Sequence, residues 1–152
     1  YYSQTGNTKK MAESVTEGIK KEGLEAALKD IKDVDVDELL KYDGIVIGSP
    51  TYYGTMAAQL KRLLDDSVKF HGKLGGKVGA AFSSSANVGG GNETTVLDIL
   101  KAMLIHGMII QGDPQGDHYG PVSIGAPDAR ATKQCVRLGQ RVAKLVTRVS
   151  VI

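Results

Sequence analysis

The stretch GIVIGSP, residues 44–50, is a continuous apolar run that ends in glycine, serine and proline. Strands of a parallel sheet are buried on both faces and show such runs, whereas half-exposed strands alternate apolar with polar residues. The runs KVGAAFSSS (77–85) and MIIQG (108–112) have the same character. We therefore predict that these three segments are parallel strands of one sheet.

Helical patterns separate the apolar runs. Apolar residues at helical spacing predict helices at about 8–22, 56–67 and 96–104, and a basic helix closes the chain. We further predict a short strand over 24–31, a brief helical turn in the acidic stretch DVDVDELLKYD (33–43), and an edge strand at 122–124 within the loop 111–127. Alternating strands and helices with right-handed crossovers predict an α/β fold with a central parallel sheet between two helix layers.

Composition limits the class of protein. The chain has 152 residues, of which 41% are hydrophobic and 24% charged, so we expect a single domain over 1–152. Cys135 is the only cysteine, which excludes an intramolecular disulfide and fits a reducing compartment, and we expect a cytoplasmic protein. No apolar run approaches the roughly 18 residues of a membrane helix, so we expect no membrane insertion.

Positive charge gathers near the carboxyl end. From residue 129 onward the chain has no acid and six bases, Arg130, Lys133, Arg137, Arg141, Lys144 and Arg148, whose spacing places them on one face of a helix. A solvated face is the favoured interpretation, and a docking surface for an anionic ligand or partner is the alternative. No aromatic residues interleave with these bases, so we do not expect nucleic-acid binding.

Polar loops follow the predicted strands, and loops at the carboxyl ends of parallel strands meet at one edge of a sheet. The first loop, Ser3-Gln4-Thr5-Gly6-Asn7-Thr8, combines hydroxyls, an amide and a glycine at a helix amino terminus, which suits a phosphate group. The alternative is that these residues only cap the helix. The nucleotide motif G-x-x-x-x-G-K-[ST] is absent, and no aspartate stands behind a strand to bind a metal, so we expect no metal site.

Two further loops could hold a flat, partly polar ring. Residues 50–54, PTYYG, place two adjacent tyrosines at a strand end, and SSSANVGGG (83–91) supplies hydroxyls and accessible backbone amides. The alternative for the tyrosines is ordinary packing against the helix that follows. The conjunction of the three loops favours ligand binding.

These residues resemble a known family. SQTGNT is similar to the S/T-x-T-G-x-T phosphate loop of flavodoxin-like FMN proteins. GSPTYYGTMAAQLKRLLD, AFSSSANVGGGNETT, HGMIIQG and HYGP together resemble the tryptophan-repressor-binding-protein (WrbA) type of NAD(P)H:quinone oxidoreductases. The resemblance implies a flavodoxin-like three-layer sandwich with strand order 2-1-3-4-5, FMN as cofactor, NADH or NADPH as electron donor, quinones as acceptors and a homotetramer or dimer.

The resemblance also implies the site residues. Phosphate contacts would come from the first loop, ring contacts from 50–54, and ribityl and ring contacts from 83–91. The residues expected to bind the cofactor are Ser3, Gln4, Thr5, Gly6, Asn7, Thr8, Pro50, Thr51, Tyr52, Tyr53, Gly54, Ser83, Ser84, Ser85, Gly89, Gly90 and Gly91. His106 would lie near the flavin as the catalytic residue, or it packs at a helix end beside Gly107.

The sequence also allows other functions. A flavodoxin-type electron carrier without its own small-molecule substrate is the main alternative function, and a binding module that has lost FMN is a third. The family has a full first strand before the phosphate loop, whereas only Tyr1 and Tyr2 stand there in this sequence. A sheet that loses its central strand leaves backbone groups of both neighbours unpaired, so we expect residues upstream of Tyr1.

Overall fold

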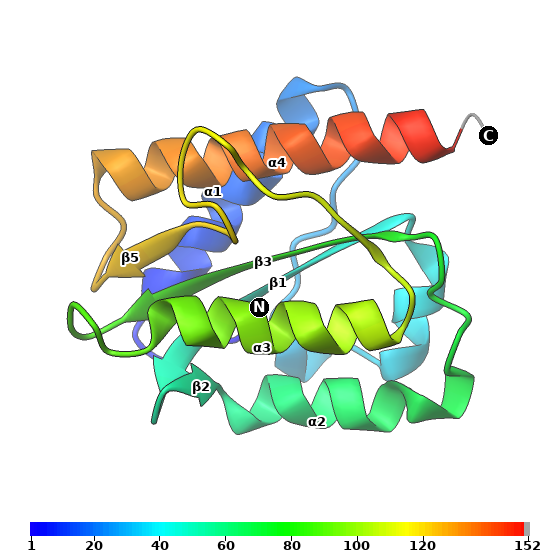
Figure 1. Cartoon of the computed structure of the whole chain (residues 1–152), viewed down its shortest axis with the longest axis horizontal. Helices are drawn as coiled ribbons and strands as arrows, with labels where there is room; N and C mark the ends of the chain where they lie inside the picture. The colour runs from blue at the N-terminus through cyan, green and yellow to red at the C-terminus, as the bar shows by residue number, and fades with distance from the viewer. Residues whose placement is uncertain (151–152) are drawn as a thin grey trace.

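The computed structural model describes residues 1–150 and has a central, mostly parallel sheet between two layers of helices (Figure 1). Strand β1 (Gly44–Tyr52) pairs in parallel with β3 (Val78–Ser85), which pairs in parallel with β4 (Ile109–Ile110) at one end and β5 (Val122–Ile124) at the other. The short strand β2 (Thr55–Met56) folds back antiparallel onto the end of β1. The predicted α/β fold and its three parallel strands are confirmed.

Helices cover both faces of the sheet. Helices α1 (Asn7–Lys21) and α4 (Ala129–Val149) lie on one face, and α2 (Ala58–Asp66) and α3 (Asn92–Ile105) on the other (Figure 1). Alternate residues of the strands point to opposite faces, so Ile45 and Ile47 pack toward α2 and α3, whereas Val78 and Phe82 pack toward α1 and α4. All residues of β3 are buried, as its continuous apolar run predicts.

Helices α1 and α4 approach each other through two glycines. A methyl group on Gly18 would lie 2.0 Å from the Val136 carbonyl oxygen, and one on Gly139 would lie 2.1 Å from the Val15 carbonyl oxygen. Neither backbone can move away without separating the helices. This contact matters for the site because α1 begins at the first polar loop.

We expect Gly139→Ala to destabilise the protein, although glycine to alanine inside a helix ordinarily stabilises it by roughly 0.5–1 kcal/mol. The added methyl group would meet backbone atoms of α1, and overpacking of this kind costs about 1–3 kcal/mol. Denaturant unfolding measures the change. A variant more stable than the parent would contradict the close contact between the two helices.

Residues 24–30 do not form the predicted strand, and 31–33 form a short helical turn that was not predicted, whereas 36–41 form the expected turn in the acidic stretch. The segment is extended but has almost no hydrogen-bonded neighbour. Its only strand-like pairing is with Tyr1, whose amino group donates to the Lys29 carbonyl at 2.9 Å and whose carbonyl accepts from the Ile31 amide at 2.8 Å. A strand needs a partner along its whole length, and here the pairing stops after one residue.

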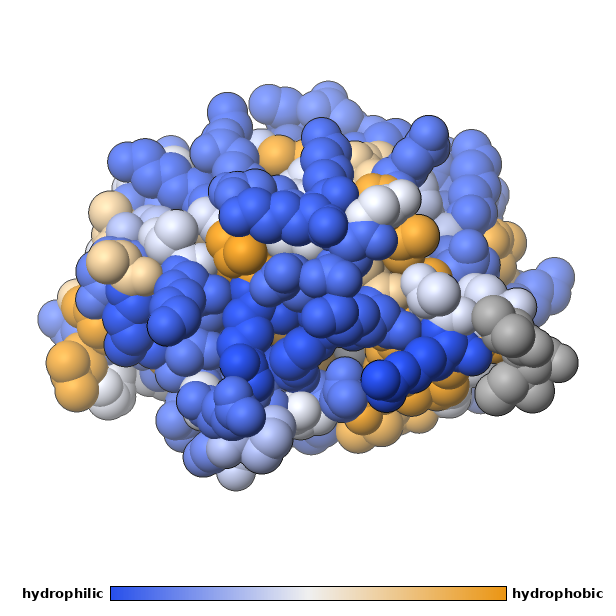
Figure 2. Space-filling model, turned by 90° about the horizontal axis from the view of Figure 1, so that it is seen from above, coloured by the Kyte–Doolittle hydropathy of each residue, from blue (hydrophilic) through white to orange (hydrophobic). Residues whose placement is uncertain are grey.

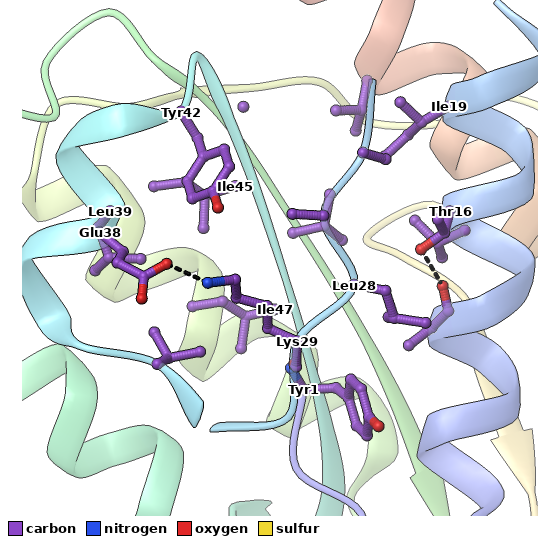
Figure 3. Close-up of a pocket in the computed structure, with 18 of the residues that line it drawn as sticks. Tyr1, Thr16, Ile19, Leu28, Lys29, Glu38, Leu39, Tyr42, Ile45 and Ile47 are labelled. Carbon is purple, nitrogen blue, oxygen red and sulfur yellow. Dashed lines mark hydrogen bonds and ion pairs between the residues drawn. The ribbon is translucent and has the colours of Figure 1, made fainter. Parts of the chain in front are cut away.

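A cavity of about 400 Å³ separates residues 24–29 from β1 (Figure 3). Figure 3 shows Leu28 and Ile19 on one side of it and Ile45 and Ile47 on the other, so its lining is largely apolar. The Tyr2 amide donates to the Gly48 carbonyl at 3.1 Å. The backbone groups of Gly48, and of every second residue of β1, therefore point toward the side of the strand on which the cavity lies. The strand expected upstream of Tyr1 stays a prediction.

The basic face of α4 holds the loop 111–121. Arg137 Nε and Arg141 Nη1 lie 2.6 and 3.1 Å from the Asp113 carboxylate, and Arg130 pairs with Asp117 at 2.8 Å. The surface over this helix is mostly hydrophilic (Figure 2). Half of the six bases thus pair with acids of this loop, so the face is neither simply solvated nor an open docking surface. None of the helices within residues 1–150 is both long and apolar enough to cross a membrane.

Asp113 is almost fully buried, and the hydrogen bond from Arg137, supported by Arg141, lowers its pKa from 3.8 to about 2. Because the folded pKa lies below the unfolded one, this group stabilises the fold above pH 3.8 and loses its contribution as pH falls toward 2. We expect Asp113→Asn to lower the free energy of unfolding by about 2 kcal/mol at pH 7. Unfolding measured from pH 7 to pH 2 should show this difference shrinking, and a constant difference would contradict the ion pair.

Candidate functional site

Three of the predicted polar loops meet at the carboxyl edge of the sheet. Pro50 lies opposite Ser84 in the β1–β3 register, so the loops that follow these strands leave side by side. The first loop joins them through a buried hydrogen bond between the Thr8 and Ser84 hydroxyls, 2.9 Å apart. The loop 111–121 reaches the same part of the sheet only at its end, where Val122 pairs with Ser83.

The first loop presents unused hydrogen-bond donors. Helix α1 is capped by Gly6, which has a φ of 90° and supplies no side-chain cap. The Ser3 hydroxyl accepts from the Gly6 amide at 3.1 Å, whereas the exposed Thr5 hydroxyl has no partner within residues 1–150. The alternative that these hydroxyls only cap α1 therefore does not describe this helix. Its amino terminus faces outward with uncapped amides, an arrangement that attracts anions.

The predicted pair of tyrosines lies on a tight β-hairpin. Thr51 and Tyr52 of β1 pair with β2 across the two-residue turn Tyr53-Gly54. Both turn residues have positive φ angles, 48° and 81°, as in a type I′ turn, which favours Asn-Gly and disfavours a tyrosine. Such backbone strain costs about 1–3 kcal/mol and is concentrated at functional sites.

The Tyr53 side chain is fully exposed, so it gains nothing from packing within this chain. The alternative that both tyrosines pack against the following helix does not hold for Tyr53. Tyr52 is also partly exposed, and its hydroxyl donates to Gln4 Oε1 at 3.1 Å, which links the hairpin to the first loop.

The glycine-rich loop lies against the hairpin. Residues 86–90 are exposed, and Gly91, with a φ of 96°, caps α3. A methyl group on Gly91 would lie 2.7 Å from the Gly54 Cα, so the two loops touch through glycine backbones. The predicted residues Gly89 and Gly90 lie on the open side of this contact and carry no side chain that would block a ligand.

The three predicted serines lie beneath the surface. Ser83, Ser84 and Ser85 are no more than 7% exposed. The Ser83 hydroxyl bonds Thr51 at 2.9 Å, and the Ser85 hydroxyl donates to the Asn87 carbonyl at 3.0 Å. Their hydroxyls therefore hold the loops together, and a ligand would meet the backbone above them.

The structure does not bring His106 to these loops. Helix α3 begins at the glycine-rich loop and runs for 14 residues, about 21 Å, toward the opposite edge of the sheet. His106 caps its far end, where the Gly107 carbonyl accepts from Gly76, just before β3. A residue that follows this helix cannot reach the loop edge of the same chain.

The surroundings of His106 are those of a packed side chain. Its Nε2 lies 2.7 Å from the Ser67 hydroxyl, and Nδ1 is buried without a hydrogen-bond partner within residues 1–150. Burial, with a smaller effect of His71, lowers the pKa of His106. Burial therefore favours the neutral form of this imidazole, which lies at the edge away from the loops, as in the packing alternative for this residue.

Sequence reasoning missed three residues at the start of α3. Thr94 and Thr95 bond both the hairpin and Gly91, and Asp98 accepts from Thr55. The polar run NETT (92–95) at the head of α3 was the available signal for Thr94 and Thr95, whereas Asp98 lies beyond it. Within residues 1–150 no group of three or more His, Cys, Asp or Glu side chains could hold a metal ion.

Comparison with known proteins agrees with this geometry. The family model for Flavodoxin matches residues 1–94, and a flavodoxin from Aquifex aeolicus is 41% identical over 155 residues, covering 96% of this chain and 84% of that protein. The chain belongs to the flavodoxin family. This flavodoxin-family chain is also 32% identical to an NAD(P)H dehydrogenase (quinone) from Archaeoglobus fulgidus, covering 97% of the chain and 95% of the relative.

Solved structures show the same fold. A flavodoxin from the domain Archaea superposes with a TM-score of 0.80 at 29% identity, covering 97% of this chain and 95% of its own. A flavodoxin described as WrbA-like, from Agrobacterium tumefaciens, gives 0.82 at 28% identity, covering 97% and 94%. The expected flavodoxin-like fold and the resemblance to WrbA-type proteins are thus confirmed.

Proposed function

We propose that this chain binds FMN at the loop edge of the sheet. The phosphate, with close to two negative charges, would be held by the uncapped amino terminus of α1 and the hydroxyls of Ser3 and Thr5. The FMN ring would lie beside the Tyr53 hairpin and the glycine-rich loop 86–91. Two observations support the fit. Exposed hydrogen-bond donors of the first loop have no partner within the described chain, and the exposed Tyr53 side chain is held on a strained backbone.

We further propose that the protein is an NAD(P)H:quinone oxidoreductase. Bound FMN would supply hydride-transfer chemistry between a nicotinamide and a quinone, and solvent would supply the proton that completes the hydroquinone. The chain itself would position the two substrates in turn against the FMN ring, and it needs no acid–base residue for this. No role is assigned to His106 within one chain, because it lies at the opposite edge.

The main support for this function is the absence of charged side chains from the rim of the site, that is, from the three loops around it. Residues 3–8, 49–57 and 83–92 contain no Asp, Glu, Lys, Arg or His. A neutral planar quinone can approach such a rim without desolvating a charge. Electron carriers recognise protein partners through charge complementarity, and the rim offers none. Relatives named NAD(P)H dehydrogenase (quinone) support the proposal.

A flavodoxin-type electron carrier is the second candidate. It is favoured by the 41% identity to the Aquifex aeolicus flavodoxin, which exceeds the 32% identity to the Archaeoglobus fulgidus quinone dehydrogenase. We also propose a cytoplasmic location, supported by the buried thiol of Cys135, and a dimeric or tetrameric assembly, supported by the WrbA resemblance alone.

We expect Thr5→Leu to weaken FMN binding by about tenfold or more, because it removes a phosphate donor and places an apolar group against a doubly charged anion. Thr5 is exposed and has no partner in the described chain, so the thermal midpoint of the apoprotein should stay unchanged. Thr5→Ser keeps the hydroxyl and serves as the matched control. Equal FMN titrations for all three proteins would remove Thr5 from the phosphate site.

Stopped-flow spectroscopy of the anaerobic FMN-loaded protein tests the activity. We expect NADH or NADPH to bleach the flavin absorbance in one two-electron step, and benzoquinone mixed afterwards to restore it in equimolar amount. Failure of both nicotinamides, together with two separate one-electron steps in a chemical titration, would identify a carrier instead. Purified protein that binds no FMN would leave only a binding module.

A further inference from the structure

The first two turns of α3 are bonded to the hairpin along its length. The Thr94 hydroxyl lies 2.8 Å from the Gly54 carbonyl oxygen at the tip, and the Thr55 hydroxyl donates to Asp98 Oδ2 at 2.7 Å beside the tip. At the stem, the Thr95 hydroxyl bonds the Thr51 hydroxyl at 3.1 Å. Residues 94, 95 and 98 share one side of the helix, so all three contacts reach the hairpin together.

The same two threonines also hold the glycine-rich loop. The hydroxyls of Thr94 and Thr95 lie 2.9 and 2.8 Å from the Gly91 carbonyl oxygen. The backbone of Gly91 in turn leaves no space for even a methyl group against Gly54. The single Thr94 hydroxyl proton is shared between the Gly54 and Gly91 carbonyl oxygens, so this side chain links the hairpin to the glycine-rich loop.

Little else fixes the tip of the hairpin. A two-residue strand such as β2 is marginal by itself, and Tyr53 has no packing partner because it is fully exposed. Tyr52 anchors the stem to Gln4 on the other side. At the tip the side-chain anchors come from α3, and Asp98 is itself held by Lys101 at 2.6 Å.

We propose that Thr94 and Asp98 are positioning residues that hold the Tyr53 ring in place against the ring of FMN. They act through Gly54 and Thr55, the two residues that follow Tyr53, and they touch neither substrate. The inference rests on the proposed binding of FMN. It adds that helix α3, which lies behind the site, determines together with the loops how rigidly the FMN ring is bound.

Thr94→Val removes the hydroxyl and preserves the shape of the side chain. We expect it to raise the FMN dissociation constant about tenfold and to increase the fluorescence of bound flavin, because a mobile Tyr53 stacks less well. The affinity for inorganic phosphate should not change, since the first loop is untouched. Asp98→Ala should act in the same direction, and Thr94→Ser should restore the parent values.

Thr147→Val is the matched control. Within residues 1–150 the Thr147 hydroxyl bonds only the Ala143 carbonyl of α4, far along the chain from the site, so this variant should bind FMN like the parent. Unfolding curves for all variants separate a loss of affinity from a loss of folded protein. Thr94→Ser provides the same separation if Thr94→Val folds poorly.

A double-mutant cycle with Tyr53→Ala gives the decisive result. If Thr94 acts through Tyr53, Thr94→Val should change FMN affinity by less than about twofold in the Tyr53→Ala background. Equal effects in both backgrounds, or no effect in the parent, would overturn the positioning role while FMN binding by the parent still stands. A parent protein that binds no FMN would refute the proposed function and this inference together.

Discussion

The parallel pairing of β1 with β3 is the constraint on which the site depends. The two strands run side by side through seven paired residues, from Gly44 opposite Val78 to Pro50 opposite Ser84. Because the pairing is parallel, both chains leave the sheet at the same edge. The buried Thr8–Ser84 hydrogen bond then fixes the amino terminus of α1 to that edge. The first loop, the tyrosine hairpin and the glycine-rich loop thus become neighbours through the strand pairing and this side-chain hydrogen bond.

Hydroxyl groups serve two purposes at this edge. The buried ones, on Thr8, Ser83, Ser84 and Thr95, bond one another, the half-buried Thr51 hydroxyl or a backbone carbonyl, which satisfies them inside the protein and ties the loops together. The exposed Thr5 hydroxyl has no hydrogen-bond partner within residues 1–150 and is available to a ligand. The hydroxyl-rich sequence at these strand ends therefore builds a rigid support beneath the proposed binding surface.

The sequence predicted what depends on local pattern. Continuous apolar runs identified β1 and β3, and the polar loops after them were correctly expected to converge. The segment 24–31 was predicted as a strand from its composition, but a strand also requires a neighbour, and only Tyr1 pairs with it. The pairing of Arg137 with Asp113 joins residues 24 positions apart, which helical periodicity cannot reveal.

His106 lies in a motif that resembles one of the family, but the fold of this chain places it away from the loops. HGM resembles a family motif, and the resemblance placed His106 near the flavin. The alternation of strands and helices already implied that a residue between α3 and β4 lies at the opposite edge from the loops, and the structure shows this. Thr94 and Thr95 belong to no recognised motif. They were missed because their importance depends on the hairpin that packs against them.

FMN binding at this edge requires that the amino terminus of α1 and its loop bind the phosphate group. Backbone amide NMR with FMN and with riboflavin, which lacks the phosphate, separates this contact from the contacts of the ring. We expect FMN to shift the amide signals of residues 5–9 strongly and riboflavin to leave them nearly unchanged, while both ligands shift signals of residues 52–54 and 88–91. Equal shifts of residues 5–9 by the two ligands, or no shift by FMN, would contradict the account.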